Sequence, residues 1–159
     1  MNQPTRGKRK ASSRTATRKP KVRRKHPEYG TSKLEDRFAK EFLDKLGVKY
    51  TRQYKAEDIG RYYDFFIIIE GKSGILIEID GDYFHSFGLV HEEKNRMQKH
   101  NEYVDKVKDE WAIKHKIPLL RIWEHDINDN PGIVLKELKQ IVQKYQGKVD
   151  LENNKKKRH

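Results

Sequence analysis

Apolar residues recur at every fourth position in the segment 32–46. They are Leu34, Phe38, Phe42 and Leu46. This spacing puts them on one face of an amphipathic helix, and Gly47 is a typical helix terminator. Ser32 is a suitable N-cap, and Glu35 three residues later completes a capping box. The pattern therefore predicts a helix over 32–46 in which Glu35 already has a structural role.

The segments that follow alternate between apolar runs and turn-forming residues. They predict strands over 48–56, 61–69 and 75–80, a helix over 92–115, a strand over 117–123 and a helix over 133–145. The strands 61–69 and 75–80 are apolar on both faces, which is typical of central strands covered by helices on each side. The sequence therefore predicts an α/β fold, with a small mixed β-sheet flanked by helices.

Three carboxylates interrupt the two central strands. Asp64 lies among Tyr and Phe residues, and Glu78 and Asp80 lie among Ile and Leu residues. A buried carboxylate costs several kcal/mol unless it is paired or binds a metal. Strand alternation sends Glu78 and Asp80 to the same face. A hairpin turn centred near Lys72 would place Asp64 opposite Ile79 or Asp80, so the three acids are expected to meet.

Oxygen ligands at this density suit Mg²⁺ or Mn²⁺. The alternative is that these acids lie at strand ends and pair with Lys or Arg in solvent, as most strand acids do. That explanation is adequate for a single acid. Three acids on adjacent strands instead favour a metal or catalytic site.

The strand 75–80 leads through Gly81 to His85. Taken alone, His85 is one of seven histidines and would be an ordinary loop residue. Near a group of acids, however, an imidazole is a suitable general base, because its unperturbed pKa lies close to neutral. The sequence therefore adds a candidate base to the candidate metal site.

The chain carries 36 Lys and Arg against 24 Asp and Glu, and this excess is unevenly distributed. Residues 1–30 have a net charge of +10, residues 31–147 of −1 and residues 148–159 of +3. We interpret these parts as a disordered basic arm, a folded domain and a disordered basic C-terminal tail.

The basic arm lacks the apolar residues that would offset the entropy of ordering, so we expect it to be disordered when free. A solubilising tail is one interpretation, but its charge density favours contact with nucleic acid. The residues expected to contact DNA are Arg6, Lys8, Arg9, Lys10, Arg14, Arg18, Lys19, Lys21, Arg23, Arg24 and Lys25.

The chain contains no cysteine, which excludes disulfide scaffolds and cysteine-based zinc sites. No apolar run approaches the ~20 residues that a membrane span needs. The basic start also lacks the apolar stretch of a signal peptide. We therefore expect a protein of a reducing compartment that is neither secreted nor embedded in a membrane.

Taken together, these segments resemble the PD-(D/E)XK nuclease superfamily, and within it the very-short-patch repair endonuclease and the related EDxHD homing endonucleases. The resemblance covers about residues 31–127. It rests on the order and spacing of the helix with Glu35 and of the segments Tyr62–Phe65, Glu78–His85, Asn101–Trp111 and Leu119–His125. It implies a restriction-endonuclease-like core.

The resemblance also implies roles for individual residues. Asp64 would be the principal metal ligand, His85 the base that activates water, and Glu35 the helix acid that faces the site. The aspartate that orients the histidine falls at Asp105, with Asp109 as the second choice.

The metal ligands would then be Asp64 with Glu78 or Asp80, and the family's backbone-carbonyl ligand falls at Ile79. The superfamily's lysine, two residues after its second acid, is replaced here by Asp80. The positive charge that this lysine supplies would have to come from the metal, from the candidate base or from another cation, such as Lys94, Arg96 or Lys99. The cysteine-bound zinc of the repair enzyme cannot form, which favours a phage or mobile-element nuclease.

We therefore expect a Mg²⁺- or Mn²⁺-dependent endonuclease of homing or phage type that hydrolyses double-stranded DNA in the cytoplasm of a bacterium or phage-infected cell. One small active site cuts one strand at a time, so a double-strand cut would need a homodimer or two successive nicks. The alternatives are a mismatch- or structure-directed nickase and a non-catalytic nucleic-acid-binding protein.

Aromatic residues in the loop after the acids bear on the choice of substrate. Tyr83, Phe84 and Phe87 could insert between DNA bases. Packing is the commoner role of such side chains, and we expect it for Tyr83 and Phe84.

Overall fold

A computed structural model of the chain describes residues 32–70 and 73–156. The predicted basic arm over residues 1–30 therefore lies outside the described residues, and so do the last three residues of the predicted C-terminal tail. Among the described residues, no helix has the length and apolar character needed to cross a membrane.

The first helical segment follows the predicted pattern. It comprises α1 (Lys33–Phe38), a π-helical turn η1 (Ala39–Leu43) and α2 (Asp44–Leu46). The predicted capping box is present, because the Ser32 hydroxyl accepts from the Glu35 N–H and the Glu35 carboxylate accepts from the Ser32 N–H. The segment ends at Gly47, whose φ of +65° is a left-handed conformation that glycine adopts without strain.

Four strands form one mixed sheet in the order β1-β2-β3-β4. The strands are β1 (Lys49–Ala56), β2 (Arg61–Glu70), β3 (Ser73–Asp80) and β4 (Leu119–Trp123). The pairs β1–β2 and β2–β3 are antiparallel, and β3–β4 is parallel. The predicted α/β class and the central position of the two apolar strands are confirmed.

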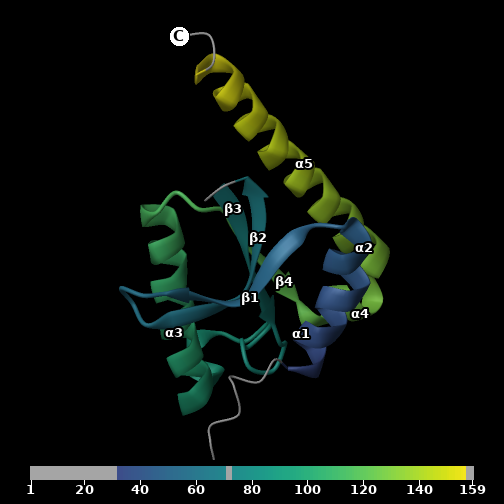
Figure 1. Ribbon diagram of the computed structural model, residues 1–159. Helices are drawn as coiled ribbons and strands as arrows, with labels where there is room; N and C mark the ends of the chain where they lie inside the picture. The colour runs from purple at the N-terminus through teal and green to yellow at the C-terminus, as the bar shows by residue number, and fades with distance from the viewer. Residues whose placement is uncertain (1–31, 71–72, 157–159) are drawn as a thin grey trace, which may run out of the picture.

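The remaining helices cover the sheet on both sides. They are η2 (His91–Glu93), α3 (Arg96–Lys114), α4 (Glu124–Asp129) and α5 (Pro131–Lys156). Figure 1 shows α3 on one side of the sheet and α1, α2, α4 and α5 on the other. Helix α4 was not predicted, and α5 continues past the predicted end at Tyr145. The expectation of a disordered C-terminal tail is wrong for residues 148–156, because they continue this helix.

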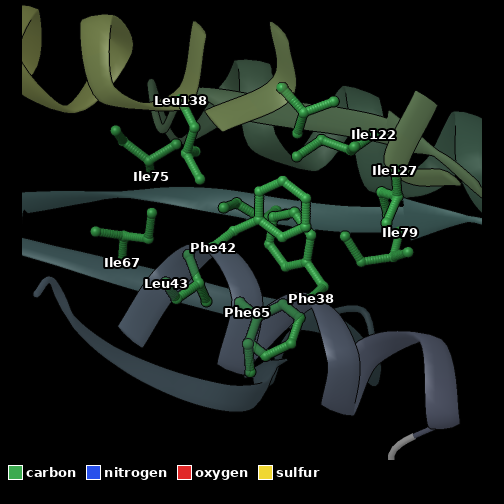
Figure 2. Close-up of a cluster of buried hydrophobic side chains, with 13 residues drawn as sticks. Phe38, Phe42, Leu43, Phe65, Ile67, Ile75, Ile79, Ile122, Ile127 and Leu138 are labelled. Atoms are coloured by element: carbon green, nitrogen blue, oxygen red, sulfur yellow. The ribbon is translucent and has the colours of Figure 1, made fainter. Parts of the chain in front are cut away.

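Two apolar clusters hold these layers together. The larger cluster joins α1, η1, α4 and α5 to one face of the sheet, and Figure 2 shows Phe38 and Phe42 among the isoleucines of the strands. The smaller cluster joins Trp111 and Ala112 of α3 to Tyr63 and other residues of the opposite face. Because both faces of β2 and β3 are covered, polar side chains on these strands can reach solvent only near the strand ends.

The register of β2 and β3 differs from the expected one. Glu70 pairs with Ser73, but an irregularity next to this pair shifts the ladder, and Phe65 pairs with Ile77. The pairing ends at Phe65, and the Asp64 carboxylate contacts the Ile79 N–H, so Ile79 is one of the two neighbours that the sequence predicted for Asp64. The shift in register was not predicted, because an apolar run gives no indication of a bulge within it.

Candidate active site

A polar pocket of about 300 Å³ opens where β2 and β3 reach the same end of the sheet. Strands, α1, α3 and the loop after β3 all contribute to its wall. Its lining residues are Glu35, Asp64, Glu78, Ile79, His85, Asn101, Val104, Asp105 and Lys108. The structure therefore brings together most of the residues that the sequence assigned to the site.

At this end of the sheet, the side chain of Asp64 replaces a backbone hydrogen bond between β2 and β3. The β2–β3 pairing ends at Phe65, and the next contact is made by the Asp64 carboxylate, which accepts the Ile79 N–H at 2.7 Å. On the other side, the β1–β2 pairing skips Gln53, whose φ is +51°. Burial and then the charge of Glu35 raise the pKa of Asp64 to about 6, so its ionised form is costly without a cation.

Glu78 is more deeply buried, with 4% of its surface exposed. Its Oε2 accepts from the Lys108 ammonium at 2.7 Å. Its Oε1 is buried and has no hydrogen-bond partner among the described residues. Burial and then the charge of Asp64 raise the pKa of Glu78 to about 8, although Lys108 opposes this shift.

Glu35 serves the helix and the pocket at once. One carboxylate oxygen completes the capping box, and the other accepts from the Gln53 amide at 3.0 Å. This second contact ties α1 to the point where β1 departs from regular pairing. Glu35 therefore lies at the pocket wall with a fixed orientation, as the resemblance implied.

His85 lies on a tight turn after β3 and is paired with α3. Its Nδ1 donates to the Asp105 carboxylate at 2.7 Å, which leaves Nε2 as the ring nitrogen that can bind water. Two further α3 side chains hold the loop, since Gln98 donates to the Tyr83 carbonyl and Asn101 to the Phe84 carbonyl. Of the two aspartates considered for orienting His85, Asp105 is the one in contact.

The charge state of this pair follows from its surroundings. Burial lowers the pKa of His85, but the Asp105 hydrogen bond and the charges of Asp80 and Asp105 outweigh it, so the pKa lies above its ordinary value. Burial likewise raises the pKa of Asp105, but His85 and Arg121 hold it below its ordinary value. Asp105 is therefore a charged partner that favours proton uptake by the histidine.

Asp80 is not grouped with the other two strand acids. Both of its oxygens accept from the Arg121 guanidinium, at 2.9 and 3.0 Å, and it does not line the pocket. Among the described residues, no three His, Asp or Glu side chains lie close enough together to hold a metal by themselves. The expected meeting of three acids is therefore wrong, because β4 places an arginine beside Asp80.

The sequence interpretation missed two cations. Lys108 is the one Lys or Arg that lines the pocket among the described residues, whereas Lys94 pairs with Glu102 outside it. Lys108 follows Asp105 by three residues, a helical spacing that puts both on one face. Arg121 is a lone charge within an apolar strand, and the parallel register pairs it with Glu78. The helical spacing of Lys108 and the lone charge of Arg121 are visible in the sequence, but the register that places Arg121 beside the acids is not.

The aromatic residues of the loop are exposed. Tyr83 and Phe84 have 63% and 54% of their surface accessible, and Phe87 is exposed as well. Tyr83 and Phe84 were expected to pack, but their rings contact each other edge-on with centroids 5.4 Å apart and join neither apolar cluster. The reason is that the loop leaves the sheet at Gly81, beyond the reach of either apolar cluster.

The pocket fits a divalent cation held by two carboxylates. Mg²⁺ is commonly bound by one or two protein carboxylates, with water and phosphate oxygens as its other ligands. Asp64 and Glu78 are the two candidates, and the unpartnered Glu78 Oε1 is an acceptor that such an ion would satisfy. Ile79 also lines the pocket, and its carbonyl is the third oxygen that the resemblance assigns to the metal.

Comparison with protein-family models and with curated proteins gives no match for this chain. The functional assignment therefore depends on the geometry of the pocket and on the motif resemblance.

The raised pKa of Asp64 predicts how stability depends on pH without a divalent cation. The folded protein holds this proton more tightly than the unfolded chain, whose pKa is close to 3.8, so stability falls as pH rises through the window from 3.8 to about 6. At pH 8 in EDTA, Asp64→Asn should raise the free energy of unfolding by about 1 to 3 kcal/mol, because it removes a buried charge.

Urea denaturation at pH 4 and pH 8 measures this difference. Asp129 is exposed, so Asp129→Asn serves as the control. It should change the free energy of unfolding only slightly, and by the same amount at both pH values. A loss of stability in Asp64→Asn at pH 8 would contradict the electrostatic account of the pocket.

Proposed function

We propose that this protein is a metal-dependent endonuclease that hydrolyses phosphodiester bonds in DNA. The observation that carries the proposal is the combination of two buried carboxylates, one with an unpartnered oxygen, and a His–Asp pair in the same pocket. Carboxylates alone would suit a structural cation. The adjacent oriented imidazole adds the proton acceptor that hydrolysis requires.

A bound Mg²⁺ or Mn²⁺ would act as a Lewis acid toward the scissile phosphate. Asp64, Glu78 and the Ile79 carbonyl are the groups that would hold it. His85 accepts a proton from the attacking water at Nε2, and Asp105 stabilises the imidazolium that forms. Glu35 contributes a further fixed carboxylate oxygen at the pocket wall.

DNA is the proposed substrate because of charge and resemblance together. The pocket is acidic and would repel a phosphodiester without a metal, whereas the segment 1–30 carries a net charge of +10. The pairing of His85 with Asp105 and the position of Glu35 support the proposed resemblance to EDxHD-type PD-(D/E)XK enzymes. A homing or phage nuclease, acting as a nickase or as a homodimer on double-stranded DNA, is the proposed type.

A structure- or mismatch-directed nickase is the second candidate. It is favoured by the exposure of Tyr83, Phe84 and Phe87 on the loop that also carries His85. Exposed aromatic side chains beside a cleavage site can stack on bases that are already unpaired. A substrate series with and without a mismatch separates this candidate from cleavage of regular duplex.

Supercoiled plasmid incubated with the protein and Mg²⁺ should be nicked or linearised, and EDTA should abolish the reaction. Asp64→Asn should reduce the rate by about 100-fold or more while keeping DNA binding, because it removes a metal ligand. His85→Ala should lose about 100-fold or more as well, because it removes the base. Gel quantification of open-circular and linear DNA measures each rate.

The exposed His100 on α3 provides the matched control, since His100→Ala should leave the rate unchanged. The wild-type rate should also rise with pH as His85 loses its proton. Absence of metal-dependent cleavage at any salt concentration would reject the nuclease and favour a non-catalytic nucleic-acid-binding protein.

The charge distribution predicts a separation of binding from chemistry. A variant lacking residues 1–25 should bind DNA more weakly and with a smaller dependence on salt concentration. The reason is that fewer phosphate contacts form, so binding releases fewer counterions. Its cleavage rate at saturating DNA should stay close to that of the full chain. Fluorescence anisotropy across a salt series tests this, and an unchanged salt slope would show that the arm does not contact DNA.

A further inference from the structure

Lys108 occupies an unusual position for a lysine. Only 12% of its side chain is exposed, and its ammonium lies 2.7 Å from Glu78 Oε2 in the wall of the pocket. The Tyr63 ring supports it, with the ammonium 5.4 Å from the ring centroid, and the Tyr63 hydroxyl donates to the Lys108 carbonyl at 2.7 Å. The residue is therefore held in place by its backbone and its side chain together.

Lys108 contacts only one of the two carboxylate oxygens of Glu78. Lys108 satisfies one carboxylate oxygen, and the other is buried without a partner among the described residues. A single ammonium on a flexible stem can leave such a carboxylate when a stronger cation arrives. A divalent ion would attract the same carboxylate with twice the charge and would repel the ammonium.

We propose that Lys108 is the exchangeable cation of this pocket: it is hydrogen-bonded to Glu78 in the metal-free protein, a divalent ion displaces it, and the freed ammonium then contacts the scissile phosphate. This inference rests on the proposed function for its last step only. It assigns to α3 the positive charge that the motif family carries on the strand, where this chain has Asp80. The competition between the two cations does not depend on cleavage.

The three stages place different demands on the side chain. In the metal-free protein, Lys108 lowers the cost of burying Glu78, so its removal destabilises the fold. With metal present, its charge opposes metal binding, so its removal strengthens binding. During cleavage its charge stabilises the phosphate, so its removal slows the reaction. A purely structural lysine would show the first effect without the second.

Isothermal titration with Mn²⁺ in the absence of DNA tests the competition. Lys108→Met should bind Mn²⁺ about fivefold or more tightly than the wild type, because a like charge has been removed from beside the ion. Lys106→Met is the matched control, since Lys106 lies on the same helix with 75% of its side chain exposed and should bind Mn²⁺ as the wild type does. Equal or weaker binding by Lys108→Met would overturn the proposal, as would a wild type that binds no Mn²⁺.

Amine labelling of the wild type keeps the proposal testable if Lys108→Met does not fold. Addition of Mg²⁺ should raise the labelling rate of Lys108 several-fold, measured by mass spectrometry, because the ammonium leaves Glu78. The labelling of Lys106 should not change. An unchanged rate at Lys108 in saturating Mg²⁺ would overturn the displacement.

Plasmid cleavage separates this inference from the proposed function. At saturating Mg²⁺, Lys108→Met should cleave about 10-fold or more slowly than the wild type, and Lys108→Arg should retain part of the rate. Tighter Mn²⁺ binding with no cleavage by any variant would support the competition and reject the nuclease. Cleavage by the wild type with unchanged binding and rate in Lys108→Met would support the nuclease and reject the role of Lys108.

Discussion

Burial of carboxylates at one end of two apolar strands is the constraint on which the candidate site depends. Each acid is compensated by a different element of the fold. Arg121 of β4 forms an ion pair with Asp80. Lys108 of α3 donates a hydrogen bond to one oxygen of Glu78, and the Ile79 N–H donates one to Asp64. The compensation is complete for Asp80 and incomplete for the other two. Asp64 and Glu78, whose pKa values are raised, both line the pocket.

This partial compensation accounts for the arrangement of the layers around the sheet end. Helix α3 supplies the partner of His85, the cation for Glu78 and the side chains that hold the loop after β3. Helix α1 supplies Glu35 through a capping contact. Apolar packing holds the helices on the sheet, and the site is assembled at the strand ends, where α1 and α3 contribute polar side chains. In the proposed nuclease, the acidic pocket would admit a phosphate only with a metal, and the basic arm would provide affinity.

The sequence was sufficient for the fold class, for the capping box with Glu35 and for the gathering of Asp64, Glu78, His85 and Asp105 around one strand end. These features depend on local periodicity or on the motif resemblance. It was not sufficient for the partner of Asp80, because that partner comes from β4, and the pairing of distant strands leaves no local pattern. The bulge near Glu70 was missed because an apolar run does not indicate one, and the exposure of the aromatic loop because the sequence does not show where the loop leaves the sheet.

The position of a bound divalent ion tests the account most directly. Crystals of the protein grown with Mn²⁺ can be examined by anomalous scattering at the manganese absorption edge. We expect one ion between the carboxylates of Asp64 and Glu78, with Lys108 withdrawn from Glu78 and Asp80 still bound to Arg121. An ion held by Asp80, or no ion in the pocket at saturating Mn²⁺, would contradict this expectation.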